Sequence, residues 1–427
     1  MGFLYSALLA LGLLVASPYF VVQGLRHRKY FHNLRQRFGR LPESVRRLAP
    51  GGIWVHAVSV GEVLAVVPLL RHLKQRFPNC TLLLSTVTLT GQRVAARDPQ
   101  LADATFYFPF DFSFALRRAL AEVRPALVVI AETEIWPNFL LEAQRAGVPV
   151  VFVNGRLSDR SFRCHCALPF WRAFLRRGLS TPALFLMQTE QDADRIRALG
   201  APPARVAVGG NLKFDVPCPA RPGFLDALEQ DGPVIVAGST MEGEDGILVE
   251  ALGALQREFP GTLLVLAPRH PERFERVAAL LEARRLRFLR RSAARGTNHF
   301  SGTNRPDVLL LDTVGELAGT YAAATVAFVG GSLVPAGGHN PIEPALWGKP
   351  ILFGPSMENF RQMARAFQQA GAALEVRDPA DLGRRLAELL RNPEQRAAMG
   401  RAALALVEAN RGAAARAAEK VAEFLRA

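Results

Sequence analysis

The sequence alternates short apolar runs with amphipathic segments, and this alternation occurs twice along the chain. In the first half, six runs have the length and composition of buried strands: residues 53–58, 81–85, 105–108, 126–130, 148–153 and 184–187. The segments between them have helical spacing, as at 64–77, 114–123 and 139–146. Apolar strands separated by helices are typical of a parallel sheet that is covered on both faces.

The alternation stops at the prolines near 202–203 and 217–222 and then resumes. Five further runs read as strands: 234–237, 263–267, 308–311, 326–329 and 351–353. A chain of 427 residues is also too long for one ordinary core. We therefore expect two doubly wound Rossmann-like α/β domains, at 26–207 and 208–405, whose crevices face one another across a cleft. We expect residues 406–427 to form a C-terminal helix that packs back on the first domain.

The N-terminus has the pattern of a membrane anchor. Residues 2–22 contain no charged side chain, which is about the length that crosses the hydrocarbon core of a bilayer. Only Glu43 opposes the basic residues that follow, which are Arg26, Arg28, Lys29, Arg35, Arg37, Arg40, Arg46 and Arg47. A signal peptide has the opposite order, with its charges before the apolar run. We expect residues 1–25 to be an uncleaved anchor, spanning or in-plane, that holds the protein in the cytoplasm.

The formal net charge of +14 predicts an anionic partner. Zinc-finger spacing and aromatic RNA-binding signatures are missing, so nucleic acid is not expected. Between Asp159 and Glu190 no acidic residue occurs, and arginines alternate with aromatic residues. We interpret this segment as a basic helix at an anionic membrane surface. The alternative is an ordinary helix whose apolar face packs on the sheet.

The cysteines predict neither disulfides nor a metal site. The chain has four, Cys80, Cys164, Cys166 and Cys218, with no framework spacing. Cys164-His165-Cys166 lacks a second pair of ligands, and in an extended strand His165 would point away from both thiols. Reduced thiols are the prediction, as in a reducing cytosol.

The stretch from Gly330 to Pro344 has the pattern of a phosphate-binding loop. A predicted strand at 326–329 leads into four glycines, and Asn340-Pro341 follows as a helix N-cap and first helical residue. A strand, a glycine loop and a helix start are where α/β proteins bind phosphate. Glu343 would then accept hydrogen bonds from a ribose diol. The alternative is that Asn340-x-x-Glu343 is only a capping box.

Two groups of carboxylates follow predicted strands in the first half. Glu62 lies just after the first strand, where a helix begins, and is a candidate general base. The helix N-terminus is expected to keep it ionised, although Ser59-x-x-Glu62 is also a capping box. Glu132 and Glu134 follow the fourth strand, and the alternative is that they cap the helix after Pro137.

Cationic and small polar groups come from the connector and the second half. Lys213 lies in the connector, and Arg269 follows a strand of the second half, as does the pair Ser239 and Thr240. Lysine, arginine and a helix start can stabilise negative charge that develops on a leaving group. Because the sequence has no Asp-x-Asp pair suited to Mg²⁺, we expect a metal-independent reaction.

Seven stretches, taken in order, resemble the motif series of the Kdo (3-deoxy-D-manno-octulosonic acid) transferase family: residues 56–62, 85–91, 132–137, 154–156, 210–215, 267–274 and 330–344. Members are membrane-associated glycosyltransferases with the GT-B fold that attach Kdo to lipid A precursor in Gram-negative bacteria. The resemblance implies an inverting transfer from CMP-Kdo to a lipid A precursor such as lipid IVA. It also implies the cytoplasmic face of the bacterial inner membrane, and no cofactor.

The resemblance also implies roles for particular residues. It makes Glu62 the proton acceptor, with Glu132 and Lys213 stabilising the transition state. The residues implied to bind CMP are Pro268, Arg269, Val314, Gly315, Glu316, Asn340, Pro341, Ile342 and Glu343. Further donor-side candidates are Ser239, Thr240, Gly331, Ser332, Gly337 and Gly338, and acceptor-side candidates are Ser59, Gly61, Thr88, Glu134 and Arg156. Met241 stands where relatives are expected to have histidine.

Two other functions stay open on the sequence alone. One is a GT-B enzyme that acts on a UDP-sugar, as another transferase or a 2-epimerase. The other is a membrane-tethered basic module that binds anionic lipid without turnover.

Overall fold

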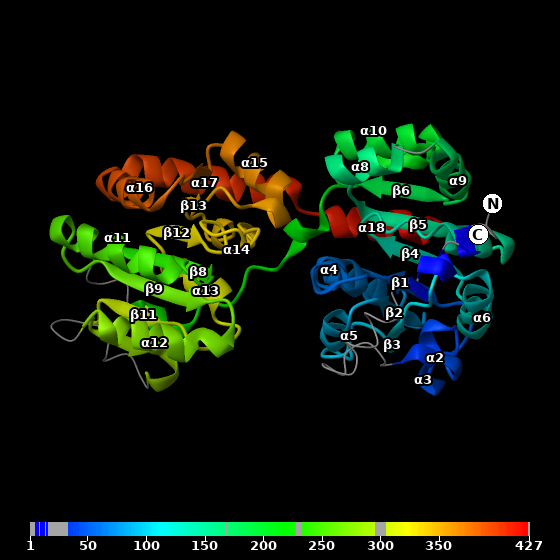
Figure 1. Ribbon diagram of the computed structural model, residues 1–427, viewed down its shortest axis with the longest axis horizontal. Coiled ribbons are helices and arrows are strands. Elements are labelled where there is room, and N and C mark those ends of the chain that lie inside the picture. Colours follow the sequence, from blue (N-terminus) through cyan, green and yellow to red (C-terminus); the bar gives the residue numbers. More distant parts are fainter. Residues whose placement is uncertain are drawn as a thin grey trace. The chain divides into compact units, whose positions relative to one another are not determined.

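The computed structural model describes residues 5–7, 9–12, 14–15, 33–166, 169–227, 232–294 and 305–425. The chain divides into two compact units (Figure 1). The first unit comprises Met1–Val216 and Asn410–Ala427, and the second comprises Pro217–Ala409.

The first unit is built on a seven-stranded parallel sheet. Its strands are β1 (Ile53–His56), β2 (Leu82–Thr86), β3 (Ala104–Tyr107), β4 (Leu127–Ala131), β5 (Val150–Gly155), β6 (Leu184–Met187) and β7 (Val206–Val208). They lie in the order β3-β2-β1-β4-β5-β6-β7. The chain direction across the sheet therefore reverses between β1 and β4, which is the position where open α/β sheets bind ligands.

Helices cover both faces of this sheet. They are α2 (Leu34–Arg37), α3 (Glu43–Arg46), α4 (Val60–Arg76), α5 (Leu89–Ala95), α6 (Ser113–Val123), α7 (Pro137–Arg145), α8 (Asp159–Cys166), α9 (Pro169–Leu179), α10 (Glu190–Leu199) and α18 (Ala413–Glu423). Trp54, Phe106 and Phe139 belong to the core on the face of α6 and α7. Val55, Val66 and Ala417 belong to the opposite core, beneath α4 and α18. Both strand faces are apolar because both are buried.

The second unit repeats this plan. Its strands are β8 (Val234–Thr240), β9 (Leu263–Pro268), β10 (Phe288–Arg290), β11 (Val308–Leu310), β12 (Val326–Val329), β13 (Ile351–Phe353) and β14 (Ala373–Glu375). All pairs are parallel, in the order β10-β11-β9-β8-β12-β13-β14. Here the direction reverses between β8 and β12.

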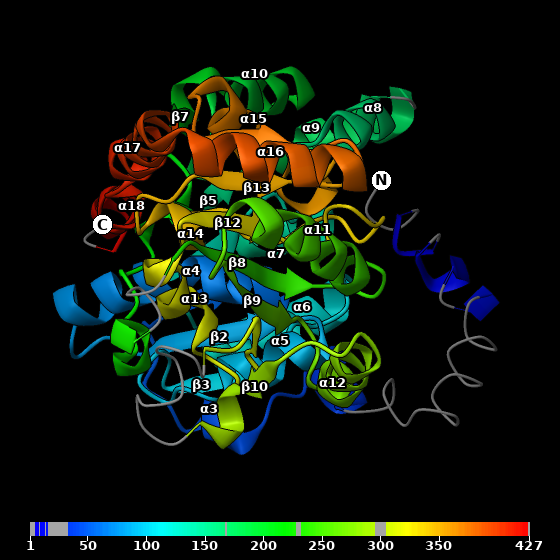
Figure 2. The same cartoon turned by 90° about the vertical axis from the view of Figure 1, so that its left-hand side faces the viewer.

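The helices of the second unit are α11 (Glu244–Glu258), α12 (Phe274–Ala283), α13 (Leu317–Thr320), α14 (Ile342–Ala345), α15 (Arg361–Gln369), α16 (Pro379–Arg391) and α17 (Pro393–Asn410). α11 and α16 lie side by side over one face of the sheet (Figure 2). The other face is covered by α13 and by two short 3₁₀ turns, Gly223–Ala227 and Tyr321–Ala323.

The two parallel-sheet α/β domains expected from the sequence are present. Three strands that the pattern did not predict, β7, β10 and β14, are three residues long and lie at sheet edges. The first unit extends past the expected boundary at 207, because β7 pairs with β6 and Leu212 is buried in the first unit's core. α18 packs against α4 within that unit.

The N-terminal stretch is described only in part, and its described residues between 5 and 15 are helical. Among the residues with assigned positions, no helix combines the length and the apolarity needed to cross a bilayer. The expected anchor falls partly outside the described residues. Arg37, one of the basic residues that follow the expected anchor, donates to the carbonyl of Val87 and lies 5.0 Å from the ring centre of Tyr107.

The arginine-rich segment forms two helices, α8 and α9, so Cys164-His165-Cys166 is helical and not extended. In α9, Phe174 and Leu175 are buried while Arg176 and Arg177 are exposed. Phe174 and Leu175 are thus buried within the first unit, as the alternative of an ordinary helix predicts for its apolar face, and the interpretation of the segment as a basic helix at an anionic membrane surface stays a prediction. All four cysteines are free thiols.

Candidate functional site

Glu62 lies in the first turn of α4, directly after the carboxyl end of β1. The backbone N–H of Val58 donates to its Oε2 at 2.8 Å, and the hydroxyl of Ser59 donates to its Oε1 at 2.9 Å. Ser59 is the N-cap residue, but its side chain accepts no capping hydrogen bond. The side-chain hydroxyl is thus committed to Glu62, and the two oxygens of the carboxylate are held in one orientation.

Burial has the largest effect on the pKa of Glu62. Desolvation raises its pKa above the ordinary carboxyl value, and the charge of Glu132 raises it further. The hydrogen bond from Val58, that from Ser59 and the charge of Lys213 lower it, but they do not cancel the burial. The helix start was expected to keep Glu62 ionised, and burial acts against that effect. A raised pKa makes Glu62 a stronger base once it is ionised.

Glu132 and Lys213 form an ion pair at the carboxyl end of β4, with 3.0 Å between Nζ and Oε1. The side chains of Lys213 and Glu132 are 23% and 16% exposed, so the pair is partly shielded from water. Glu132 adopts a left-handed backbone with φ 55°. A non-glycine residue in this region is strained, and such strain is concentrated at functional sites.

Glu134 belongs to the same group of charges. Burial, with the charges of Glu62 and Glu132, raises the pKa of Glu134 to about 7. The loop that carries it is tied to the loop after β5, because the backbone N–H of Arg156 donates to the hydroxyl of Thr133 at 2.7 Å. The structure thus brings Glu62, Glu132, Glu134 and Lys213 together where the sheet direction reverses.

The other acceptor-side candidates lie around this group. Thr88 caps α5 by accepting from the N–H of Gly91 at 3.0 Å, and its own N–H donates to the carbonyl of Val58 at 3.1 Å. Gly61 is exposed in the first turn of α4. The loop before Glu62 is therefore braced by the start of α5.

Sequence reasoning missed the residues that hold Lys213. Lys213 lies in a 3₁₀ turn, Leu212–Asp215. Asn154, itself left-handed with φ 57°, accepts from the N–H of Leu212 at 3.0 Å, and Asn211 accepts from the N–H of Lys213 at 3.0 Å. Asp215 accepts from the N–H of Gly412 at 2.5 Å and from that of Ala414, at the start of α18. The C-terminal helix thereby holds the turn that carries Lys213.

In the second unit, the loops after β8 and β12 touch at the switch point, which is the place where the strand order of the sheet reverses direction. A side chain on Gly330 would lie 2.6 Å from the carbonyl oxygen of Ser239. Gly331 is left-handed with φ 68°, and a side chain there would meet His339 at 2.9 Å and Met241 at 3.4 Å. Ser239 is also left-handed, with φ 57°. Both glycines are required because the two backbones approach so closely.

The first half of the glycine loop is not free to bind a phosphate. The backbone N–H groups of Gly331, Ser332 and Leu333 donate to the carboxylate of Glu244 on α11. The hydroxyl of Ser332 donates to the carbonyl of Val329 and accepts from the N–H of Gly354. The prediction of a phosphate cradle is therefore wrong for residues 331–333, because an internal acceptor already occupies it.

The second half of the loop carries Glu343, in the short helix α14. Burial raises the pKa of Glu343 to about 7, while the charge of Arg269 and a hydrogen bond from Asn340 oppose the rise. Arg269 also helps burial to lower the pKa of His339, to about 4. Arg269, His339, Asn340 and Glu343 thus interact electrostatically near the carboxyl end of β9.

The start of the helix α14 differs from the predicted one, in which Asn340 is the N-cap. Pro341 occupies the N-cap position of α14, and the side chain of Asn340 accepts from the N–H of Ile342 at 3.1 Å. Glu343 bonds to the Asn340 side chain, so it is tied back to the start of its own helix, as in the capping-box alternative but through the side chain of Asn340. The charge of Arg269 acts on this linked pair.

The other donor-side candidates are placed as follows. Val314 is 82% exposed, Gly315 is left-handed, and Glu316 accepts from Arg291 at 2.8 Å. Pro268 ends β9, and the hydroxyl of Thr240 donates to Asp245 at 2.7 Å. Gly337 and Gly338 are left-handed and pack against Asn359 and Met357.

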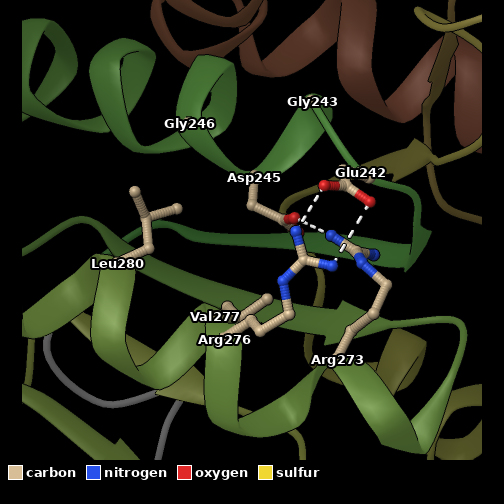
Figure 3. A pocket seen from close by; sticks show the side chains of 8 residues that line it. All are labelled: Glu242, Gly243, Asp245, Gly246, Arg273, Arg276, Val277 and Leu280. Carbon is tan, nitrogen blue, oxygen red and sulfur yellow. Dashed lines mark hydrogen bonds and ion pairs between the residues drawn. The ribbon is translucent and has the colours of Figure 1, made fainter.

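A cavity of about 280 Å³ lies beside the first turn of α11 (Figure 3). Two ion pairs, Glu242–Arg276 and Asp245–Arg273, cross it, and Val277 and Leu280 also line it. None of the predicted nucleotide-binding residues lines this cavity. Over the described parts of the chain, no group of three or more His, Cys, Asp or Glu side chains is arranged to hold a metal ion.

Two doubly wound parallel-sheet α/β units give the chain a GT-B-like fold. In agreement, the chain shares its fold with UDP-GlcNAc 2-epimerase from Neisseria meningitidis bound to UDP-GlcNAc. The TM-score is 0.56 at 14% identity, over 88% of this chain and 99% of that one.

Sequence comparison is more specific. A family model for 3-deoxy-D-manno-octulosonic-acid transferase (kdotransferase) matches residues 32–216. The 3-deoxy-D-manno-octulosonic acid transferase of Haemophilus influenzae is 36% identical, over 96% of each chain. That of Bordetella pertussis is 39% identical, over 91% of each chain. This chain belongs to the 3-deoxy-D-manno-octulosonic acid transferase family.

Proposed function

We propose that the protein transfers Kdo from CMP-Kdo to a lipid A precursor, lipid IVA, in lipopolysaccharide biosynthesis. The observation that carries the proposal is the group of Glu62, Glu132 and Lys213, coupled at the first switch point in a chain that belongs to the Kdo transferase family. The members of this group are a buried carboxylate with a raised pKa and a shielded ion pair.

In the proposed reaction, Glu62 accepts the proton of the acceptor hydroxyl as that oxygen attacks the anomeric carbon of Kdo. The bond between that carbon and the phosphate oxygen breaks, and CMP leaves with the electron pair. Inversion follows from attack opposite the leaving group. Lys213 and Glu132 stabilise the charges that develop in the transition state, and preorganised charges of this kind account for much of the rate enhancement of many enzymes. The reaction is proposed to need no metal and no cofactor.

The second unit is proposed to bind CMP. Arg269 supplies positive charge for the phosphate, and Glu343 and Asn340 are the polar side chains beside it. A carboxyl whose pKa is raised to about 7 is partly protonated at neutral pH, so it can both donate to and accept from a ribose hydroxyl.

Action at the cytoplasmic face of the inner membrane, with residues 2–22 as anchor, is part of the proposal. Exposed Leu11, Leu14 and Val15 in the described part of that stretch support it, as do the exposed arginines of α9. Vesicles of neutral lipid with and without anionic lipid test this. Binding that depends on anionic lipid and falls with salt is expected, and equal binding to both would contradict it.

Mass spectrometry of lipid IVA after incubation with CMP-Kdo and the full-length protein tests the reaction. A mass increase by whole Kdo residues is expected, and an unchanged acceptor mass would contradict the proposal. The alternative UDP-sugar enzyme is separated by melting temperature. CMP should raise it and UDP should not, since only a ligand that binds the folded state stabilises it.

A further inference from the structure

Glu244 is a buried carboxylate with an unusual set of partners. It is the first residue of α11, and none of its surface is exposed. Four backbone N–H groups donate to it: Met241 at 2.8 Å and Gly331 at 2.6 Å to Oε2, and Ser332 and Leu333 at 2.9 Å each to Oε1. Both oxygens act only as acceptors, as in the ionised form.

Three of these four N–H groups belong to the loop after β12, and the fourth belongs to the loop after β8. Successive N–H groups that converge in this way form a nest, the backbone arrangement that binds anions. Here the nest lies at the switch point of the second unit, where a ligand anion would be expected. The chain fills the nest with its own carboxylate.

Because Glu244 fills the nest, it also holds the neighbouring residues of the glycine loop in place. Gly331 is the first residue of the nest, and its left-handed backbone lies close to the His339 ring and to Met241. The carbonyl of Gly331 also accepts from the N–H of Gly338 at 2.7 Å. The position of Gly331 therefore determines the path that the loop takes from Gly338 to His339 and Asn340.

We propose that Glu244 is the positioning residue of the donor site, an internal anion that occupies the amide nest and holds the glycine loop in its nucleotide-binding shape. The inference rests on the proposed binding of CMP to the second unit. Glu244 itself does not contact the nucleotide. The donor's phosphate is then bound by Arg269 and the second half of the loop, and not by the amides of 331–333.

Without the carboxylate, four backbone N–H groups would lose their acceptor, and those of Gly331 and Ser332 are buried. Because buried donors that lack an acceptor are strongly disfavoured, the loop would rearrange. A glutamine at 244 keeps the size but has one oxygen, and its NH₂ group would face two N–H donors. An alanine leaves an empty, amide-lined space of about carboxylate size.

The test measures CMP binding by calorimetry on the full-length protein and its Glu244→Ala and Glu244→Gln variants. We expect CMP to bind at least about tenfold more weakly to both, and the Michaelis constant for donor to rise while that for acceptor stays the same. Glu242→Gln is the matched control, because Glu242 lies two residues away but pairs with Arg276 (Figure 3). It should bind CMP as the native protein does.

Chemical rescue separates positioning from a general loss of structure. Formate carries the missing carboxylate and should restore most of the CMP affinity of Glu244→Ala, whereas chloride at the same ionic strength should not. Affinities within about twofold of native in both variants would overturn the inference. So would equal effects of formate and chloride on Glu244→Ala. If Glu244→Ala does not fold, the Glu244→Gln affinity decides alone. Failure of the native protein to bind CMP would instead refute the proposed function.

Discussion

At the scale of single residues, the candidate base is tuned by opposing contacts. Burial and Glu132 raise the pKa of Glu62, while Val58, Ser59 and Lys213 lower it. Because the base must be ionised to accept a proton, activity should rise with pH through the pKa of Glu62. The acid limb of the pH–rate profile should therefore lie above the ordinary carboxyl value of 4.5.

Ser59→Ala tests this tuning. The substitution removes a hydrogen bond that favours the ionised form, so the pKa of Glu62 should rise. A bond of about 1 kcal/mol corresponds to an upward shift of roughly 0.7 pH units in the acid limb. The measurement is kcat/KM against pH for both proteins. Thr88→Ser keeps its capping hydroxyl and should leave the limb in place. A limb that moves to lower pH in Ser59→Ala would contradict the assignment of Glu62.

At the scale of elements, α18 supports the site of the first unit. Asp215 accepts from two N–H groups at the start of this helix, and it lies two residues after Lys213. The start of α18 and the turn that carries Lys213 are therefore held together by one side chain.

Asp215→Ala should remove the cap and loosen the turn. Loss of a cap costs about 1 kcal/mol of unfolding free energy, and transfer activity should fall together with stability. Asp226→Ala removes only an exposed ion pair with Arg221 and should change neither quantity measurably. Denaturant unfolding and the transfer rate are the two readouts. Full activity in Asp215→Ala would show that α18 does not position Lys213.

A second element-scale contact joins the N-terminal segment to the first unit. Asp111 accepts from the N–H groups of Asn138 and Phe139 at the start of α7, and from the hydroxyl of Tyr5. The ring of Tyr5 lies 5.2 Å from that of Phe174. Burial raises the pKa of Asp111 to about 7 from its ordinary 3.8.

This raised pKa has a definite consequence for stability. The folded protein holds the Asp111 proton more tightly than the unfolded chain, so the stabilisation is full below the ordinary pKa of 3.8 and is lost as pH rises through about 7. Asp111→Asn keeps a capping side chain without the charge. The melting temperature of this variant should fall less between about pH 5 and pH 8 than that of the native protein. Asp98→Asn, in a surface turn, should follow the native slope, and an identical slope in Asp111→Asn would contradict the account.

At the scale of the whole molecule, the sequence was sufficient for the architecture but not for its internal contacts. Apolar runs such as β6 and β12 have the predicted bounds, because a buried parallel strand needs a continuous apolar run. The strands β7, β10 and β14 lie at sheet edges and are only partly buried, so they lack the continuous apolar run that marked the equally short β11 and β13.

The candidate site also contains residues that the sequence predicted and residues that it did not. Glu62 and Glu132 were conspicuous in the sequence because each is an acidic residue that follows a predicted buried strand. Lys213 was found in the connector, and the roles of Glu132 and Lys213 came from the resemblance to the Kdo transferase family. Glu244 was not, because three of its partners lie 87 to 89 residues away and are backbone N–H groups, which leave no side-chain signal. The direction of the Glu62 pKa was also missed, since desolvation depends on the packed tertiary structure.

We propose that Glu62 is the base of a Kdo transfer reaction. The most direct test of this proposal is the rate of Kdo transfer to lipid IVA by Glu62→Gln, measured beside CMP binding and beside the exposed control Glu43→Gln. Removal of a general base costs roughly 10²–10⁴-fold in rate. We expect a loss of that size in Glu62→Gln, with native CMP affinity, and no loss in Glu43→Gln. Transfer by Glu62→Gln at the native rate would contradict it.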